Sequence, residues 1–500
     1  MAATATRDDW KTLADQVEIP HQAFIDGRYV DALSGETFDD ISPIDGRRLA
    51  QVASCGSADV DVAVAGARRA FESGVWSRSA PKQRKAVLLR LAELIREHAD
   101  ELAVLETLDM GKPISDALAD DMRLSADCIQ YYGEAVDKVY DEIAPTGPNA
   151  ISMIRREPLG VVAAVVPWNF PLMMAAWKLG PALAAGNSVV LKPAEQSPLT
   201  ALRLGALAAE AGIPDGVVQV VPGDGPGAGR PLGLHPDVDM VTFTGSTEVG
   251  KLFLRYAGES NMKRVALECG GKSPHIILPD CGDLAAAASA AAWGVFYNQG
   301  EVCNAGSRVL VHRDVKDAFM EHLLAAAGAI RPADPLDPAA RLGAMVDRTQ
   351  TDRVLSYIES GRGAGAEVVL GGSQARTETG GWYIEPTIFD RVSNDMTIAQ
   401  EEIFGPVLAT IDVASEDEAI AVANDTIYGL AAAVWTDNID RAHRVARAIR
   451  AGVVWVNTFD AGDITSPFGG FKQSGFGRDK SMHALDKYTD LKTIWVALRD

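Results

Sequence analysis

The chain has 500 residues, of which 47% are hydrophobic and 23% are charged, so it can bury the cores of two or three domains. Its net charge of -21 argues against a nucleic-acid partner, because such a partner requires a basic surface. The five cysteines form no CxxC pair and the eight histidines form no HExxH motif, so we expect neither a disulfide framework nor a metal site.

The N-terminal third of the chain is predicted to be mostly helical. Residues 57–121 and 117–140 repeat apolar side chains at spacings of three and four, which is the pattern of amphipathic helices. Residues 151–157 mix apolar and polar side chains, as an exposed or edge strand does.

The longest uncharged stretch, residues 158–177, has about the length of a membrane span. Pro167, Asn169 and Pro171 interrupt its middle, so we interpret it as a buried strand, a turn and the start of a helix. The N-terminal segment lacks the apolar core of a signal peptide. We therefore expect a cytoplasmic protein without a membrane span.

A change of pattern at Gly160 marks the start of an α/β region. Residues 161–166 are uninterrupted apolar, which is typical of a parallel strand buried on both faces. Further strand-like runs occur at 188–191, 217–221, 240–243 and 265–267, with helix-like stretches at 173–185, 199–211 and 227–232. This alternation predicts a doubly wound α/β domain that binds its ligands at the carboxyl ends of the strands.

A second α/β block begins near Gly270. Its predicted strands are 276–278, 309–311, 367–370, 407–411, 431–435 and 453–456, and its predicted helices are 284–296, 315–330, 348–360, 416–424 and 439–448. The run 492–496 is predicted to be a further strand. Together with 151–157 it has no place in either core, and such exposed edges favour pairing with another subunit in a homo-oligomer.

One cysteine stands out by its surroundings. Cys303 lies in FYNQGEVCNAGSR, residues 296–308, between a predicted helix and a predicted strand and among small residues. A nucleophilic cysteine needs such access, together with an environment that favours the thiolate. A lone cysteine is more often a small buried apolar residue, so this motif alone does not establish a nucleophile.

Two polar side chains follow predicted strands of the first block. Asn169, in VVPWNFP, can donate to a developing oxyanion, or it is an ordinary turn asparagine. Glu268, in LECGGK, lies beside two glycines that permit close approach. A carboxylate partly withdrawn from water has a raised pKa and can act as a general base toward water, whereas the alternative is an ordinary loop glutamate.

A candidate dinucleotide site uses residues at two other strand ends. Lys192 and Glu195 suit ribose hydroxyls, and the acid repels a 2′-phosphate, so NAD is favoured over NADP, which stays possible. Gly245 permits a tight turn, and Ser246 can cap a helix whose N-terminal amides favour an anion. Each pair is also compatible with an ordinary loop or turn.

Further candidates come from the C-terminal half. Glu402 and Phe404, in EEIFGP, supply an acid and an aromatic ring before a turn, although a solvated acid beside a core phenylalanine has the same pattern. Asp460 and Asp463 lie in the glycine- and aromatic-rich loop 457–472. They can meet a cationic group of a substrate, or they are solvated turn residues.

Taken together, these motifs resemble a known family. NQGEVCNAG, PWNFP, LECGGKSP, FTGSTEVG, EEIFGPV and PFGGFKQSGFGRD look like the motifs of the NAD(P)-dependent aldehyde dehydrogenase superfamily, and they occur in its order. Within it, GESNMKRVALE, ETLDMGKPI and the C-terminal sequence make the chain similar to γ-glutamyl-γ-aminobutyraldehyde and 4-guanidinobutyraldehyde dehydrogenases. One departure is Cys269, where the family often has Leu or Ala.

The resemblance implies a role for each candidate. Cys303 would be the nucleophile, Asn169 would hold the oxyanion, and Glu268 would activate the water that hydrolyses a thioester. The implied cofactor contacts are Trp168, Lys192, Glu195, Gly245, Ser246, Glu402 and Phe404. The implied aldehyde tunnel is lined by Phe170, Trp177 and Phe459, and we add Asp460 and Asp463 as its acids.

The resemblance also implies an architecture. A Rossmann-like NAD-binding domain (1–140 and 160–269) would adjoin an α/β catalytic domain (270–480) and a small β bridging domain (141–159 and 481–500). The bridging domain would join subunits into dimers or tetramers.

The expected reaction is the NAD(P)-dependent oxidation of an aldehyde to a carboxylate through a thiohemiacetal and a thioester. An ω-amino, γ-glutamylamino or guanidino aldehyde of polyamine or amine catabolism is the expected substrate. The alternatives are a broad-specificity aliphatic or betaine aldehyde dehydrogenase, a CoA-acylating variant and, from another class, a cysteine hydrolase.

Overall fold

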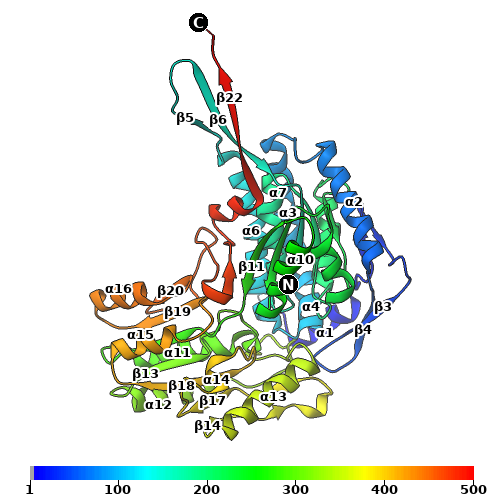
Figure 1. Ribbon diagram of the computed structural model, residues 1–500. Helices are drawn as coiled ribbons and strands as arrows, with labels where there is room; N and C mark the ends of the chain where they lie inside the picture. Colours follow the sequence, from blue (N-terminus) through cyan, green and yellow to red (C-terminus); the bar gives the residue numbers. More distant parts are fainter. Residues whose placement is uncertain (1–4, 500) are drawn as a thin grey trace.

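Two twisted sheets dominate the computed structural model, which describes residues 5–499 (Figure 1). The eight-stranded sheet has the order β2-β1-β9-β8-β7-β10-β11-β21. In that order its strands are Arg28–Val30, Ala23–Ile25, Val218–Val220, Ser188–Lys192, Val161–Val165, Met240–Gly245, Arg264–Cys269 and Gly475–Phe476. The five strands from β9 to β11 are parallel, which confirms the doubly wound region predicted from alternating apolar runs and helices.

Helices cover both faces of this sheet. Val162 and Ala164 of β7 pack into one hydrophobic core, and Val161 and Ala163 pack into another on the opposite face. Strand β7 is therefore buried on both sides, and this burial explains its uninterrupted apolar sequence. The first core contains α7 (Pro171–Ala185) and α8 (Leu199–Glu210), and the second contains α2 (Ser57–Ser73), α9 (Arg230–Leu234) and α10 (Thr247–Glu259).

The predicted helical region before Gly160 consists of several shorter helices. Gly74 and Gly111, with φ of 78° and 84°, end α2 and α4 in the left-handed conformation that glycine adopts most readily. In addition to the helices already named, the first half contains α1 (Arg7–Gln16), α3 (Pro81–Glu97), α4 (Ala99–Met110), α5 (Ile114–Asp116), the π-helix η1 (Ala117–Met122), α6 (Arg123–Ala135), the 3-10 helix η2 (Val136–Lys138) and the π-helix η3 (Gly225–Gly229).

The seven-stranded sheet forms the second α/β unit and has the order β14-β17-β18-β13-β12-β19-β20. Its strands in that order are Glu367–Leu370, Thr387–Asp390, Val407–Val413, Arg308–His312, Pro274–Ile277, Ala431–Trp435 and Val453–Val456. Its helices are α11 (Leu284–Phe296) and α12 (Lys316–Gly328) in one core, and α13 (Arg348–Gly363), α14 (Thr397–Gln400), α15 (Glu416–Asn424) and α16 (Ile439–Ala448) in the other. The sequence did not predict strand β17.

The two strands without a place in either core pair with each other. β22 (Thr489–Ala497) runs antiparallel to β6 (Ala150–Pro158) along its whole length, and β5 (Glu142–Ala144) adds to the other edge of β6. This three-stranded sheet projects from the body of the molecule (Figure 1). None of the helices in the described chain combines the length and the apolar character that a bilayer crossing requires.

The remaining short elements are β3 (Thr37–Ile41) with β4 (Arg48–Ala53), β15 (Gln374–Ala375) with β16 (Tyr383–Ile384), and the 3-10 helices η4 (Tyr297–Gly300), η5 (Thr377–Thr379), η6 (Lys472–Ser474) and η7 (Met482–Tyr488). Strand β21 matters for the site, because it brings the C-terminal segment back to β11 at the edge of the first sheet.

Candidate active site

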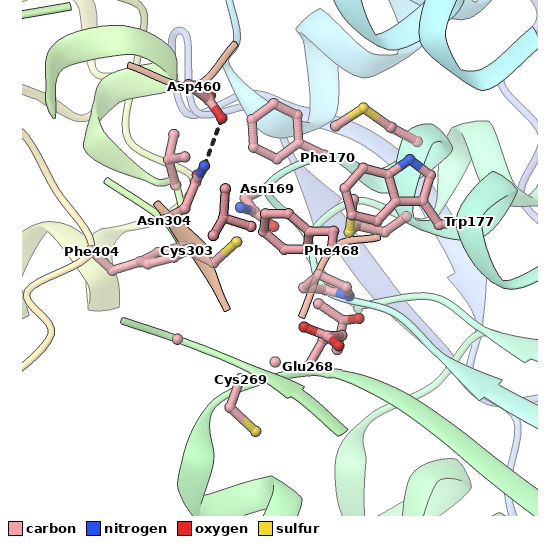
Figure 2. Close-up of a pocket in the computed structure, with 18 of the residues that line it drawn as sticks. Asn169, Phe170, Trp177, Glu268, Cys269, Cys303, Asn304, Phe404, Asp460 and Phe468 are labelled. Carbon is pink, nitrogen blue, oxygen red and sulfur yellow. Dashed lines mark hydrogen bonds between the residues drawn. The ribbon is translucent and has the colours of Figure 1, made fainter. Parts of the chain in front are cut away.

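A cavity of about 720 Å³ lies at the carboxyl ends of β7, β10 and β11 (Figure 2). Loops that precede β13 and β18 of the second sheet close its other side. The strand ends of a doubly wound sheet are where ligands bind. The cavity brings together Asn169, Glu268 and Cys303, the three residues predicted to be catalytic.

A strained turn presents Cys303 to this cavity. Asn298 and Gln299, in η4, have φ of 46° and 58°, a region that most side chains avoid. The Asn298 side-chain amide donates to the Asn169 carbonyl oxygen at 3.0 Å, and the Gln299 side-chain oxygen accepts from the Gly343 backbone amide at 3.0 Å. These buried hydrogen bonds hold the strained backbone in place.

The thiol of Cys303 does not sit among cations. Its pKa is raised well above the usual range, first because the sulfur lies deep in the protein and then because the carboxyl groups of Glu402 and Glu268 are near. Cys303 is nevertheless partly open to the cavity. These residues alone therefore do not supply the environment that favours a thiolate, and the thiol needs a base to remove its proton.

Asn169 lies beside Cys303 in Figure 2 and is buried. Its side-chain nitrogen donates one hydrogen to the Glu301 carbonyl oxygen at 2.8 Å, which fixes the orientation of the amide. The second hydrogen remains available to the cavity. A fixed amide donor next to a nucleophile can stabilise negative charge that develops on a carbonyl oxygen.

Glu268 ends in the same cavity with both carboxyl oxygens lacking a hydrogen-bond partner among the described residues. Burial raises its pKa well above the usual range, and the charge of Asp479 raises it further. Lys178, Lys487 and Arg478 act in the opposite direction. A carboxyl group in such a setting can take a proton near neutral pH.

Glycine at position 469 makes room for Glu268. A Cβ atom at Gly469 would lie 2.6 Å from Glu268 Oε1 and 2.8 Å from the Gly477 carbonyl oxygen, so a larger residue there would displace the carboxyl group or the backbone. Figure 2 shows the carboxyl group apart from Cys303, and no hydrogen bond joins the two side chains. The space between them can hold a reacting group.

Several predicted cofactor residues surround the opposite part of the cavity. Ser246 Oγ accepts from the Val249 amide at 3.3 Å and caps α10, as predicted. The nearby Thr244 hydroxyl is buried and has no hydrogen-bond partner in the described part of the chain. Glu402 accepts from the Gly271 amide at 3.1 Å, and burial raises its pKa to about 7. A capped helix start and unpaired polar atoms fit a phosphate-bearing ligand.

The loop that carries Phe404 is held in an unusual conformation. Phe404 has φ of 59°, and its ring packs edge-on against Trp168 with centroids 5.1 Å apart. The Gln350 side chain donates to the carbonyl oxygens of Ile403 and Phe404 at 3.1 and 2.7 Å. Trp168, Gly245, Ser246, Glu402 and Phe404 all line the cavity.

Lys192 and Glu195 lie outside the lining of this cavity, at the carboxyl end of β8. Lys192 is buried and donates to the Pro193 carbonyl oxygen at 2.7 Å. Its nitrogen is 3.5 Å from Glu195 Oε2, whose side chain is 42% exposed. Strand β8 adjoins β7, so this pair extends the candidate ligand surface along the sheet edge.

The aromatic lining differs from the prediction in one residue. Phe170 and Trp177 line the cavity, but Phe459 does not. The Phe459 ring stacks on His275 at 5.1 Å and packs against Trp455 in a small core of its own. Phe468 takes its place in the lining and packs edge-on against Trp177 at 5.3 Å (Figure 2).

The two predicted acids have different environments. Asp460 accepts from the Asn304 side chain at 2.6 Å, beside Cys303, and burial raises its pKa to about 6 (Figure 2). Asp463 is exposed at the mouth and accepts from the Thr465 amide and hydroxyl at 2.9 and 2.6 Å. Sequence reasoning missed Asp120, Arg123 and Lys480, which bring further charges of both signs to the lining.

Cys269 follows Glu268 but has a different orientation. Figure 2 shows its sulfur on the far side of β11, as the alternation of strand side chains requires. A Cβ atom at Gly250 of α10 would lie 3.0 Å from this sulfur, so Cys269 packs closely against the helix. Burial raises its pKa to about 12.

Comparison with known proteins agrees with this geometry. The profile of the Aldehyde dehydrogenase family matches residues 29–494. The NADP/NAD-dependent aldehyde dehydrogenase PuuC of Escherichia coli (strain K12) is 52% identical over 98% of this chain and 98% of its own.

Two solved structures, each with a TM-score of 0.98 and 60% identity, cover 99% of this chain and 100% of their own. One is an indole-3-acetaldehyde dehydrogenase complexed with NAD⁺, and the other is a γ-glutamyl-γ-aminobutyraldehyde dehydrogenase from Burkholderia cenocepacia J2315. The chain therefore belongs to the aldehyde dehydrogenase family.

Proposed function

We propose that this enzyme oxidises ω-amino and γ-glutamylamino aldehydes to carboxylates with NAD as cofactor, through a thioester on Cys303. The observation that carries the proposal is the meeting of a thiol, a fixed amide and an unpaired carboxyl group in one cavity. The thiol and the amide serve the addition to the aldehyde, and the carboxyl group serves the later hydrolysis.

The first step is addition of the Cys303 sulfur to the aldehyde carbon. The thiol proton leaves to a base, because burial holds the thiol in its neutral form. The carbonyl oxygen gains negative charge, and the Asn169 side chain donates to it with its remaining hydrogen. The Cys303 backbone amide is the second donor that we assign to this oxyanion.

The cofactor surface consists of Trp168, Gly245, Ser246, Glu402 and Phe404 in the cavity, with Lys192 and Glu195 beside it. NAD, when bound, supplies the acceptor for the two electrons of the oxidation. Glu195 presents an exposed carboxylate to a ribose, and its charge disfavours a 2′-phosphate. We therefore propose a preference for NAD over NADP.

Glu268 is the general base of the last step. Its raised pKa makes the ionised form a stronger base than an ordinary carboxylate, and its unpaired oxygens can accept a proton from water. Water then attacks the thioester carbon, the carbon–sulfur bond breaks, and the product leaves as a carboxylate. The free thiol of Cys303 is restored.

The proposed substrate class rests on the mouth of the cavity and on the names of similar proteins. Asp463 and Asp120 place acids near solvent, where they can meet a cationic tail. A 60% identical structure carries the name of a γ-glutamyl-γ-aminobutyraldehyde dehydrogenase. Guanidino, betaine and simple aliphatic aldehydes are the alternative substrates in the same assay.

The test compares two cysteines of the same cavity lining. We expect Cys303→Ala to abolish NADH formation, because the proposed thioester forms on this sulfur. Cys269→Ala is the matched control and should retain activity, because its sulfur points away from the reacting groups. Retained NADH formation in Cys303→Ala would refute the nucleophile assignment, and ester cleavage without NADH formation in the wild type would favour the hydrolase alternative.

We also propose that the chain is a cytoplasmic homo-oligomer. All five cysteines are free, which suits a reducing compartment. The projecting sheet of β5, β6 and β22 exposes Ile143, Leu491 and Trp495, and such a surface favours burial against another subunit. Light scattering should give a dimer or tetramer, and a monomer at micromolar concentration would contradict this proposal.

A further inference from the structure

Lys480 occupies a rigid position at the wall of the cavity. The amide and carbonyl of Asp479 form a pair of 2.8 Å hydrogen bonds with Phe468, and the Ser481 amide donates to the Ile464 carbonyl oxygen at 2.6 Å. Between these anchors Lys480 has φ of 60° and Ser481 has φ of 52°. Two successive non-glycine residues with positive φ cost free energy, and such strain is concentrated at functional positions.

The ammonium group of Lys480 has no ion-pair or hydrogen-bond partner among residues 5–499. Its nitrogen lies 5.6 Å from the centroid of the Trp177 ring, which lines the same cavity. A lysine over a tryptophan face is held by the ring without consuming its hydrogen-bond donors. All three N–H donors of Lys480 therefore remain available to a ligand that enters the cavity.

Asp460 and Asp463 lie on the same wall of the cavity, but neither forms an ion pair or a hydrogen bond with Lys480 in the described structure. The charges of Asp460 and Asp463 favour the ammonium form, against burial, which lowers the Lys480 pKa. Asp460 is engaged by Asn304, and one oxygen of Asp463 is engaged by Thr465. The second Asp463 oxygen has no hydrogen-bond partner within the described chain. Within the described residues, the mouth therefore offers the ammonium group of Lys480 and one carboxylate oxygen of Asp463 to a ligand.

We propose that Lys480 is a specificity-determining residue that binds a carboxylate at the far end of the aldehyde, while Asp463 binds an adjacent ammonium group. The cavity would then select aldehydes that end in an amino-acid zwitterion over aldehydes that end in a cation alone. The γ-glutamylamino aldehydes have this zwitterion, and simple ω-amino aldehydes lack its carboxylate. This inference rests on the proposed function and narrows its substrate class.

The competing role for Lys480 is to neutralise Asp460 and Asp463. A neutralising lysine would form an ion pair with one of them, yet none of the ion pairs in the described structure includes Lys480. The two roles predict different responses to removal of the charge. Without a carboxylate-binding lysine, both carboxylate-bearing aldehydes lose activity. Without a neutralising lysine, the two acids favour a cationic aldehyde and repel an anionic one, but leave a zwitterion with no net charge nearly unaffected.

The experiment uses the full-length enzyme with NAD and four aldehydes. They are γ-glutamyl-γ-aminobutyraldehyde, its analogue without the α-carboxylate (the 4-aminobutanoyl amide), its analogue without the α-amino group (the glutaryl amide), and butyraldehyde as a neutral probe. The variants are Lys480→Met and Lys480→Arg. Lys82→Met removes a charge from an exposed lysine of α3, outside the cavity lining, and is the matched control.

We expect Lys480→Met to lower kcat/KM about tenfold for the two carboxylate-bearing aldehydes, the size of effect typical of a lost charge-assisted hydrogen bond. The 4-aminobutanoyl probe should be used equally well or better, and butyraldehyde should be unaffected. Lys480→Arg should restore most of the loss, because a guanidinium also binds a carboxylate. Lys82→Met should resemble the wild type with every probe.

Two results would overturn the inference. An equal loss with all four aldehydes would make Lys480 a purely structural residue. Unchanged use of the zwitterionic γ-glutamyl aldehyde, together with improved use of the 4-aminobutanoyl probe, would assign it the neutralising role. Oxidation of butyraldehyde shows that the dehydrogenase reaction itself is intact, so these outcomes then concern Lys480 and not the proposed function. A wild-type enzyme that oxidises none of the four aldehydes would contradict the proposed function itself.

Discussion

Two buried ion clusters differ in the sign of their surplus charge. The Lys112 cluster has one cation between two acids, because Lys112 Nζ lies 2.8 Å from Glu106 and 2.7 Å from Asp121. The Asp479 cluster has one acid between two cations, Lys178 and Lys487, both of which donate to Asp479. The charges of the second cluster act on Glu268, whose two carboxyl oxygens lack a hydrogen-bond partner among the described residues.

The difference in charge gives the clusters different chemistry. Burial raises the Asp121 pKa well above its usual range, and the nearby Glu106 raises it further. Asp121 is therefore a weaker acid than usual, and both acids of the Lys112 cluster contact the lysine, so we call this cluster closed. In the Asp479 cluster the lysines hold the Asp479 pKa below its usual range despite burial, which leaves one surplus positive charge. That charge becomes balanced when Glu268 ionises, so the second cluster favours a reactive base.

The largest expected effect comes from removing this base. Glu268→Gln should lower steady-state turnover by about 10²–10⁴-fold, the usual contribution of a general base. Formation of the thioester does not require Glu268 to activate water, so one equivalent of NADH should still appear rapidly. Stopped-flow absorbance distinguishes this burst from the slow phase, and an unchanged steady-state rate would contradict the assigned role.

The closed cluster should respond through stability. Lys112→Met leaves the Glu106 charge buried without a partner, and breaking a buried pair costs about 3–5 kcal/mol in the free energy of unfolding. Lys112 Nζ also lies 4.1 Å from the centroid of the Phe170 ring, so the same change affects the cavity wall. Urea unfolding at fixed protein concentration measures the loss.

The double variant Glu106→Gln/Lys112→Met tests the cause of that loss. It removes both charges, so it should recover a large part of the stability that Lys112→Met loses. A double variant that is less stable than Lys112→Met would contradict the pairing that the distances indicate.

The sequence predicted the parts of this site that depend on local pattern. The apolar run of β7 indicated a buried parallel strand, and its position located Asn169 at the strand end. Ser246 caps α10 as its place after a strand predicted. These inferences hold because strand burial and helix capping depend on residues close together in the chain.

The parts that the sequence did not reveal depend on distant segments. Phe468 enters the lining because it pairs with Asp479, and Phe459 leaves it because His275, far back in the chain, offers its ring a stacking partner. The charges around Glu268 come from α7, from the segment after β21 and from η7. No local sequence pattern indicates which of these segments meet. The raised pKa of Cys303 could therefore not be predicted either.

The smallest expected effect is a shift in pH dependence. Glu268 must be ionised to accept a proton from water, so the rate of thioester hydrolysis should rise with pH until Glu268 has titrated. The Lys487 charge stabilises the ionised form, and Lys487→Met should therefore raise the Glu268 pKa and move the rising limb to higher pH. Lys178 still pairs with Asp479 in this variant.

A shift of about one pH unit corresponds to about 1.4 kcal/mol, and it would slow turnover up to about tenfold on the rising limb. Above the shifted pKa the two enzymes should have equal rates, because the base is ionised in both. A structural defect would instead lower the rate at every pH, which distinguishes it from an electrostatic effect. A rising limb at the same pH in Lys487→Met would show that the surplus charge of the Asp479 cluster does not reach Glu268.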